Sequence, residues 1–583
     1  MPGLLHLALV GHPPVVALVL LLGCPHGVDE KPTGGVTTTP MDTGVTDTAS
    51  TDSDTTVHDS DSAGDTAVVP VVPEMDAVRL LARISLDIRG VRPDDAEIAA
   101  VQADPAAVDG FVDGWLADPR WTERLIDLYG ERFFTLTEAY TLTASDYGLD
   151  DDVGFTRSVG EEPLRLLAQI AVEDAPYTDL VTVDWTMADE RLAPAWPLDY
   201  PDGATGWQKV HYTDGRPSAG VLSTNAMWWR YGSTESNANR KRANAVSRVL
   251  LCNDYLSRPI EFERTVDLLD SDAVLDALGS DPACVGCHST LDPLASYFFG
   301  FYYYDDLSVD ELSVYHPERE ALWSALTDIA PSYYGVPGYN LADLGEQIAA
   351  DPRYVSCAVE TAFELLLRRE ATVDDVDTLT AHREAFLSGG LTLRALYRSL
   401  FRDPLYRAAP SDDVGAVATK LAPPSLISSM IDELTGFRWT DDGAEMLDTD
   451  AVGLRTLAGG SDGFTVLSTA TSPSATALIV QQRLAELAGR YAADTERRVA
   501  PESRRLFREI DFTETPDTNQ AAMEAQVQAL YLRVHGRVVA VDAAEVTTAL
   551  ALWSTLYDLD PVISNAWAGV LTLLLRDPDL VLY

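Results

Sequence analysis

Residues 108–116 read Val-Asp-Gly-Phe-Val-Asp-Gly-Trp-Leu, and their apolar side chains decide the fold class of the chain. These side chains recur at the spacing of one face of an α-helix. The same periodicity runs through most of residues 74–583, whereas the alternation typical of strands is confined to short pieces such as 464–467, Phe-Thr-Val-Leu. The sequence therefore predicts a mainly α, multi-domain helical protein.

A short Asp-Pro unit separates the predicted helices. It follows an apolar helical stretch at Asp118-Pro119, Asp351-Pro352, Asp403-Pro404 and Asp577-Pro578. An Asp side chain caps the next helix well, and Pro fits the first helical turn, where its missing N–H costs nothing. We therefore interpret the unit as a helix boundary rather than an active-site element.

Length and charge limit the classes of function. The chain has 583 residues, with 42 Lys and Arg against 91 Asp and Glu, which gives a formal charge of −49. This length predicts two or three domains. The acidic balance argues against nucleic acid as a partner, because phosphate binding requires Lys and Arg to displace counterions. After residue 25 no apolar run is long enough to span a membrane.

The amino terminus has the features of an export signal. Residues 15–22 read Val-Val-Ala-Leu-Val-Leu-Leu-Leu, an apolar run too short to span a bilayer. It leads into Leu-Leu-Gly-Cys at 21–24, which is similar to a bacterial lipobox, in which the cysteine becomes the lipidated first residue. We predict a signal peptide at 1–24 with lipidation at Cys24. The alternative is a buried amino-terminal helix with an incidental cysteine.

A polar tether is predicted to follow the signal. Residues 25–73 are rich in Thr, Ser, Asp and Gly and nearly lack large apolar side chains, so nothing there offsets the entropy of ordering the backbone. Loop-like breaks divide the rest into 74–220, 221–410 and 411–583. We therefore expect an exported lipoprotein, periplasmic or on the cell surface, that meets the membrane only through its lipid anchor.

The candidate chemistry lies in the middle of the chain, where residues 284–288 read Cys-Val-Gly-Cys-His. Two thiols at this spacing can form thioethers to the two vinyl groups of haem, and the adjacent imidazole can ligate the iron. The sequence therefore predicts one haem c, attached covalently through Cys284 and Cys287, with His288 as an axial ligand of the iron.

Two alternatives without haem remain open for this motif. Cys284 and Cys287 can form a redox or structural disulfide. They can also hold zinc together with Cys252 or Cys357, although the second C-x-x-C of a zinc ribbon is missing. Under the haem interpretation, two other thiols remain in an oxidising compartment, which favours a Cys252–Cys357 disulfide between the helices before and after the motif.

The motif does not determine the second axial ligand of the iron. No Met lies between His288 and Met430, so the arrangement of small class I cytochromes does not apply. The candidates, in order, are His316, Met227, His211 and His382. The alternative is an open distal side, which would favour small-molecule chemistry over pure electron transfer.

Residues 284–294, Cys-Val-Gly-Cys-His-Ser-Thr-Leu-Asp-Pro-Leu, resemble the haem segment of the planctomycete-type and myxobacterial cytochrome-like proteins. Residues 80–90 and the Leu-Leu-Cys at 250–252 are similar to other segments of these proteins. The family comprises large exported proteins, in which several domains of unknown function surround one haem-binding segment. The resemblance implies electron transfer or redox chemistry at the cell envelope with an unidentified redox partner, and it leaves open whether the chain is an enzyme.

Two neighbouring features bear on a haem pocket. The aromatic run 297–304 is interpreted either as a pocket wall or as a core segment of the helical bundle. The basic cluster 240–242, Arg-Lys-Arg, is interpreted either as a partner of the haem propionates or as a solvated helix face. The rival class for the whole chain is a non-enzymatic surface scaffold or binding lipoprotein, in which the cysteine pair is structural or binds zinc.

Overall fold

The part of the chain that can be described excludes the amino terminus. The computed structural model describes residues 73–258, 267, 270–302, 307–409, 419–441, 443–450 and 453–583. The predicted signal peptide, the lipidation site Cys24 and nearly all of the tether lie outside these residues. Residues 70–583 belong to one compact unit. In the described ranges, none of the helices combines the length and the apolar character needed to cross a membrane.

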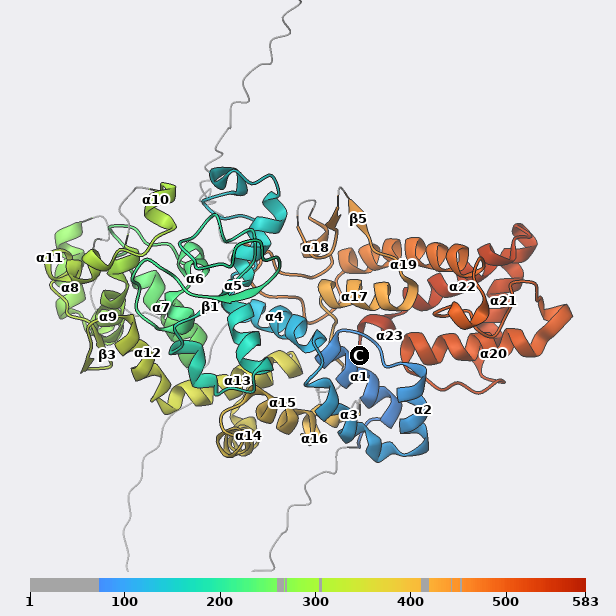
Figure 1. Ribbon diagram of the computed structural model, residues 1–583. Helices are drawn as coiled ribbons and strands as arrows, with labels where there is room; N and C mark the ends of the chain where they lie inside the picture. Colours follow the sequence, from blue (N-terminus) through green and yellow to red (C-terminus); the bar gives the residue numbers. More distant parts are fainter. Residues whose placement is uncertain are drawn as a thin grey trace, which may run out of the picture. The chain divides into compact units, whose positions relative to one another are not determined.

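The described residues are mainly α-helical, as the sequence predicts (Figure 1). The first helices are α1 (Ala77–Arg89), α2 (Asp95–Ala103), α3 (Val108–Trp115), α4 (Arg120–Phe133) and α5 (Asp152–Val172). The middle ones are α6 (Asn225–Arg230), α7 (Arg240–Leu251), α8 (Ser271–Ser280), α9 (Pro282–Ala295), α10 (Val309–Leu312), α11 (Trp323–Leu326), α12 (Leu341–Ala349), α13 (Pro352–Leu367), α14 (Val376–Ser388), α15 (Leu393–Phe401) and α16 (Pro404–Arg407). The last are α17 (Pro424–Thr435), α18 (Leu454–Leu457), α19 (Ala475–Glu496), α20 (Pro516–His535), α21 (Ala544–Leu559), α22 (Ile563–Leu575) and α23 (Pro578–Val581).

Short 3₁₀-helices and three small antiparallel strand pairs connect these helices. The 3₁₀-helices are η1 (Pro105–Ala107), η2 (Ala144–Tyr147), η3 (Tyr177–Val181), η4 (Gly220–Ser223), η5 (Tyr255–Ser257), η6 (Ser296–Phe301), η7 (Pro317–Leu322), η8 (Val373–Asp375) and η9 (Pro501–Ser503). The strand pairs are β1 (Thr186–Ala188) with β2 (Gln208–Val210), β3 (Ser332–Tyr333) with β4 (Val336–Pro337), and β5 (Thr440–Asp441) with β6 (Ala444–Glu445).

Three of the four predicted Asp-Pro units begin helices as expected, whereas α4 begins only at Arg120, after Asp118-Pro119. The carboxylate of Asp351 accepts a hydrogen bond from the Arg353 N–H at 2.8 Å, and Pro352 is the first residue of α13. Asp403 and Asp577 cap α16 and α23 in the same way. The short strand-like alternation at 464–467 does not form a strand. Asp462 accepts the N–H groups of residues 464, 465 and 466, so these residues form a tight turn instead.

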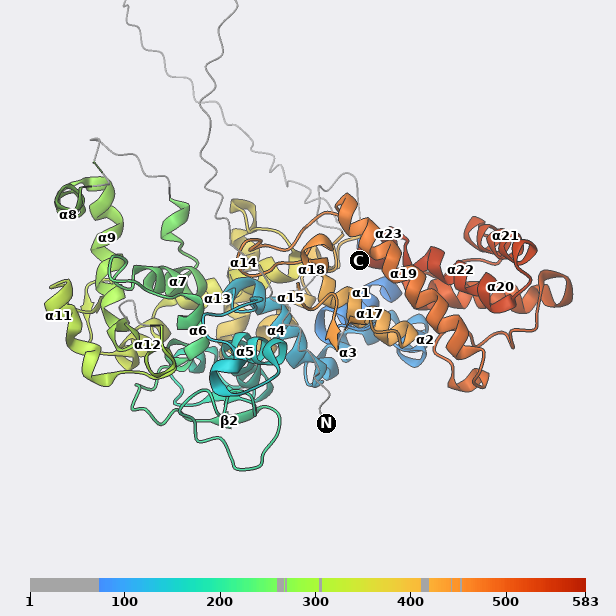
Figure 2. The ribbon, with the colours of Figure 1, turned by 90° about the horizontal axis from the view of Figure 1, so that it is seen from above.

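Two main hydrophobic cores hold the described part together. The larger contains side chains from residues 75–406, and therefore from both predicted ranges 74–220 and 221–410. The second contains side chains from residues 421–583, together with Leu86 of α1. Within this second core α19 lies beside α22, and α21 packs against α22 (Figures 1 and 2). The predicted domain boundaries themselves stay predictions.

A buried polar cluster links these two cores. Asp87 of α1 accepts hydrogen bonds from the hydroxyls of Tyr406, at 2.7 Å, and Tyr583, at 2.9 Å. The ammonium group of Lys420 also contacts the carboxylate of Asp87. All four side chains are shielded from solvent. Because a buried charge is costly without a partner, this cluster fixes α1 against the last residues of the chain.

Candidate functional site

The motif helix α9 begins with an Asp-Pro unit that the sequence analysis missed. The carboxylate of Asp281 accepts a hydrogen bond from the Ala283 N–H at 2.9 Å, and Pro282 is the first helical residue. The helix then carries Cys284, Cys287 and His288 at positions i, i+3 and i+4. Side chains at this spacing share one face of a helix. The two thiols and the imidazole therefore face the same side of α9.

His288 is held by a carboxylate one helical turn further along. Its Nδ1 lies 2.9 Å from an oxygen of Asp292, at spacing i, i+4. An ionised carboxylate only accepts hydrogen bonds, so Nδ1 is the donor in this contact and Nε2 is the ring nitrogen left for another ligand. A carboxylate on the far ring nitrogen is the usual support of a metal-ligating histidine. The geometry therefore suits ligation of a metal through Nε2.

Arg240 of α7 fixes the other side of Asp292. Its Nε and one terminal nitrogen donate to the two carboxylate oxygens, at 2.7 Å and 3.1 Å. Burial by itself would raise the pKa of Asp292, but the hydrogen bonds from His288 and Arg240, with their charges, lower it below its ordinary value. The carboxylate thus stays charged, and α7 and α9 together set the orientation of the imidazole.

The two thiols of the motif are free and half-exposed. Burial, followed by the charges of Asp281 and Cys287, raises the pKa of Cys284. Two apolar side chains of this region are uncovered: Val285, between the two cysteines in sequence, is 37% exposed, and Leu256 is 84% exposed. Leu256 belongs to the turn η5, which precedes Arg258, and Nη1 of Arg258 lies 3.9 Å from the Cys287 sulfur. Free thiols, an oriented imidazole and uncovered apolar side chains fit the attachment of a haem.

The other two described cysteines are bonded to each other. A disulfide joins Cys252, at the end of α7, to Cys357 of α13, which is the pairing expected from the sequence. Neither sulfur is then available for a zinc site with Cys284 and Cys287. Within the described residues no group of three or more His, Cys, Asp or Glu side chains is placed to hold a metal ion.

The candidates for the second axial ligand contact groups outside α9. His211 pairs with Asp199 at 3.0 Å. Nδ1 of His382 lies 2.8 Å from the Ser399 hydroxyl, and its Nε2 lies 3.0 Å from Asp403. His316 and Met227 contact other partners. Nε2 of His316 lies 3.2 Å from the Glu311 carbonyl, and Met227 of α6 is buried in the larger core. The contacts of these four residues do not bring any of them to His288.

The two neighbouring features have structural roles. The described part of the aromatic run, 297–302, is buried, and Phe298 packs against Trp228 with ring centroids 4.7 Å apart. This part is therefore a core segment. The solvated helix face considered for 240–242 holds only for Lys241, which is exposed. Arg242 is buried and donates to the backbone carbonyl of Phe301 at 2.6 Å, and Arg240 binds Asp292.

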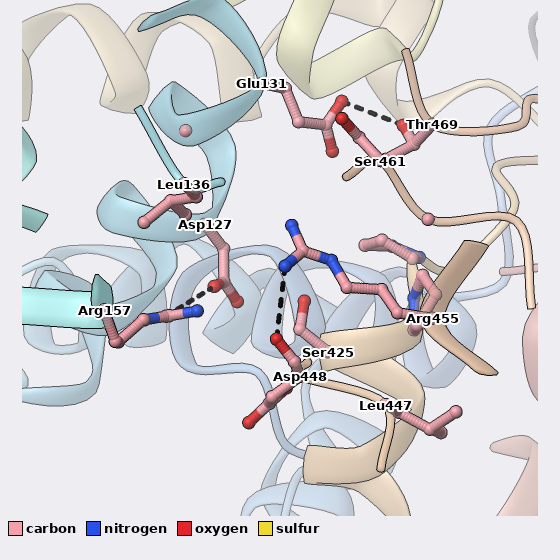
Figure 3. Close-up of a pocket in the computed structure, with 14 residues that line it drawn as sticks. Asp127, Glu131, Leu136, Arg157, Ser425, Leu447, Asp448, Arg455, Ser461 and Thr469 are labelled. Carbon is pink, nitrogen blue, oxygen red and sulfur yellow. Dashed lines mark hydrogen bonds and ion pairs between the residues drawn. The ribbon is translucent and has the colours of Figure 1, made fainter. Parts of the chain in front are cut away.

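A polar cleft is the second candidate site. It has a volume of about 710 Å³ and is lined by residues 136–138, by 151–157 at the start of α5, and by 443–449 around β6. A narrower pocket of about 40 Å³ adjoins it and shares Arg157 and Asp448 with it. Figure 3 shows Arg157 beside Asp127 of α4 in this pocket. The volume of the cleft is in the range that holds small-molecule ligands.

Asp448 is distinctive among the carboxylates of the cleft. Glu131, in the adjoining narrower pocket, accepts hydrogen bonds from Arg368 and Thr469, and Glu138 of the cleft pairs with Arg455. No hydrogen-bond donor of the described residues contacts the carboxylate of Asp448; Arg455 reaches only its backbone carbonyl (Figure 3). Although the residue is exposed in the cleft, surrounding atoms desolvate its carboxyl and raise its pKa to about 6. A carboxyl of this kind can exchange a proton near neutral pH.

Comparison with known proteins adds no assignment, because no family model, curated protein or solved structure matches this chain. Sequence reasoning missed the roles of Asp292 and Arg240. The spacing of Asp292 from His288 is readable from the sequence, since i, i+4 pairs meet on a helix. The contact with Arg240 depends on how α7 packs against α9, which no spacing along the chain reveals.

Proposed function

We propose that residues 284–288 attach one haem c covalently, in an exported lipoprotein of the bacterial envelope. Cys284 and Cys287 are the thioether donors, and His288 is an axial ligand through Nε2. The observation that carries the proposal is the shared face of α9, on which two free thiols lie beside an imidazole whose other nitrogen is bound by Asp292. The haem, when bound, supplies one-electron oxidation and reduction of iron.

The residues of the chain then have separate tasks. Cys284 and Cys287 fix the position of the group, and Asp292 with Arg240 fixes the imidazole plane. Val285 and Leu256 supply apolar surface that a macrocycle would cover. The role of the protein is electron transfer with an unidentified redox partner, or redox chemistry on a substrate at the envelope.

The compartment is supported by the disulfide and by the amino terminus. Covalent haem is attached outside the bacterial cytoplasm, where the Cys252–Cys357 disulfide is also favoured. The signal at 1–24 and the lipid at Cys24 would anchor the protein, with residues 25–73 as its tether. No nucleic acid is expected as a partner.

The test is a pyridine haemochrome spectrum of protein expressed with a c-type maturation system and separated under denaturing conditions. We expect one haem that stays with the polypeptide. The Cys284→Ser and Cys287→Ser variants should lose covalent haem, whereas Asp281→Asn, which keeps both thiols and a side chain that can cap the helix, should keep it. Purified protein without haem would contradict the proposal, and metal analysis would then test for zinc.

The rival function is a binding or scaffold lipoprotein without haem. The cleft of about 710 Å³, with the unpartnered carboxylate of Asp448, favours this alternative independently of α9. Visible absorbance separates the two functions, because only the haem protein has a Soret band. A colourless protein whose small-ligand binding is lost in Asp448→Asn would support the rival.

A further inference from the structure

The hydrogen bond between His288 and Asp292 has an electronic consequence for any metal bound at Nε2. An Nδ1–H that donates to a charged carboxylate leaves more negative charge on the ring than one that donates to a neutral carbonyl. The contact is short, at 2.9 Å, and Asp292 is 9% exposed, so water screens it weakly. His288 is therefore an electron-rich ligand, which stabilises oxidised over reduced iron.

Arg240 opposes this effect through the same carboxylate. Its Nε donates at 2.7 Å to the Asp292 oxygen that accepts from His288. The guanidinium withdraws negative charge from the carboxylate and so weakens its action on the imidazole. The two residues thus act on His288 in opposite directions, and each can be changed separately.

For the other side of an iron at His288, the described residues offer no second histidine or methionine whose contacts lead to α9. Residues 73–583 contain four further histidines, and the contacts of each go to groups outside α9. These contacts are His211 with Asp199, His316 with Glu311, His382 with Ser399 and Asp403, and His535 with the carbonyl of Leu574. The methionines Met75, Met187, Met227, Met430 and Met523 are buried in packed regions of the fold. Met446 is half-buried just after β6, where its N–H donates to the Trp439 carbonyl at 2.8 Å.

We propose, on the basis of the proposed function, that the haem is bound by the protein on one axial side alone and that its other side takes a small exogenous anionic ligand. Asp292 and Arg240 are positioning residues: both hold the imidazole of His288 in place, Asp292 makes it an electron-rich axial ligand, and Arg240 moderates that effect. Such a site suits chemistry on small ligands of iron more than pure electron transfer, for which both axial positions are usually filled by the protein.

The first experiment uses the haem-loaded full chain with cyanide as the probe. We expect an oxidised spectrum of high-spin haem that converts to low spin as cyanide binds. A low-spin spectrum without added ligand, with no response to cyanide, would overturn the inference while leaving covalent haem in place. Protein without covalent haem would overturn both this inference and the proposed function.

The second experiment measures the reduction potential of three variants by spectroelectrochemical titration. Asp292→Asn removes the charge but keeps the shape, so we expect the reduction equilibrium to shift at least tenfold toward reduced iron, about 59 mV for one electron. Arg240→Gln should shift it in the opposite direction. Arg258→Gln, the matched control, removes a positive charge near Cys287 without contacting Asp292, and should shift the equilibrium less than Arg240→Gln.

Shifts of the reduction potential in opposite directions separate this mechanism from a loss of folding. A loss of folding would shift the potential of both variants in the same direction. Equal shifts, or no shift, in Asp292→Asn and Arg240→Gln would contradict the inference. A readout without haem completes the test. Nitrogen NMR of the haem-free protein should show the proton of His288 on Nδ1, and a proton on Nε2 would overturn the role of Asp292.

Discussion

The two cysteine pairs of the described chain differ in almost every physical respect. Cys284 and Cys287 lie on one helix, one turn apart, and are free and half-exposed. Cys252 and Cys357 lie on different elements, 105 residues apart in sequence, and are bonded to each other. The first pair presents its sulfurs to a face that also carries an imidazole, whereas the second joins the ends of two packed segments.

This difference separates the scaffold from the candidate chemistry. A disulfide between distant segments restricts the unfolded chain and so stabilises the fold. Two free thiols on one helical face contribute little to the fold. Their arrangement instead suits the covalent attachment of a second molecule. The predictions below test this division, from the largest expected effect to the smallest.

Removal of the motif thiols should abolish haem attachment without unfolding the protein. In Cys284→Ser/Cys287→Ser we expect no covalent haem after denaturing electrophoresis, and a far-ultraviolet circular dichroism spectrum of unchanged helical content. The matched control is Cys252→Ser/Cys357→Ser, which should keep its haem. If the control loses haem as completely as the motif variant, the division between the two pairs is wrong.

Loss of the Cys252–Cys357 disulfide should lower stability instead. The bridge closes a long loop, so its removal should reduce the free energy of unfolding by about 2–5 kcal/mol. Urea unfolding of Cys252→Ser/Cys357→Ser against the parent measures this change. Reductant should destabilise the parent but leave the double variant unaffected, and equal sensitivity of both proteins would count against a structural bridge.

Two buried carboxyl groups with different hydrogen-bond partners give a second comparison between the candidate site and the rest of the fold. Asp292 has cationic partners, whereas the fully buried Glu162 of α5 accepts from the hydroxyls of Thr186 and Tyr212 and from the Ala226 N–H. Burial therefore raises the pKa of Glu162 from 4.5 to about 7. Because the folded value lies above the unfolded one, this carboxyl contributes stability that is complete below pH 4.5 and lost as pH rises through 7.

Glu162→Gln should remove this pH dependence, since an amide resembles the protonated acid. Above pH 7 we expect the variant to be more stable than the parent by up to about 3 kcal/mol, from 1.36 kcal/mol per pKa unit. Near pH 4.5 the two should be equally stable. Thermal unfolding measured from pH 4.5 to above pH 7 checks this. The control is Glu173→Gln, at the exposed carboxyl-terminal cap of the same helix. A parallel pH profile for parent and Glu162→Gln would refute the assignment.

The smallest expected effect concerns the cleft. Carbon NMR of the Asp448 carboxyl should give a titration midpoint near pH 6, because its surroundings desolvate it. Asp127→Asn removes a neighbouring negative charge and should lower that midpoint slightly. Asp494→Asn, on the surface of α19, should leave it unchanged. A midpoint near the ordinary value of an aspartate would show that the cleft does not perturb this group.

The helical class and its boundaries were predictable because they depend on local chemistry. The apolar stripe of 108–116 and the Asp-Pro caps need only neighbours along the chain. The turn at 464–467 was not predictable from apolar alternation, because the three hydrogen bonds to Asp462 override it. The burial of Phe298 depends on contact with Trp228, which comes from a distant helix.

The candidate site also combines features that were predictable from the sequence with features that were not. The motif 284–288 and its histidine follow from spacing, but the salt bridge between Arg240 and Asp292 joins residues 52 apart in sequence. The cleft was even less predictable from the sequence, because α5 and the β5–β6 hairpin, which line it, lie far apart in the chain. Its many carboxylates look alike in the sequence, and only the pattern of partners distinguishes Asp448.

The position of the disulfide also decides what proteolysis can do to this molecule. The bridge encloses α9 in a covalent ring, while Arg240 lies outside the ring on α7. A protease that cuts the chain once between residues 253 and 356 therefore releases no fragment, because both halves stay joined through sulfur. Under the proposed export to the envelope, where proteases are abundant and reductants scarce, a nicked molecule would keep the motif helix and its supporting arginine together.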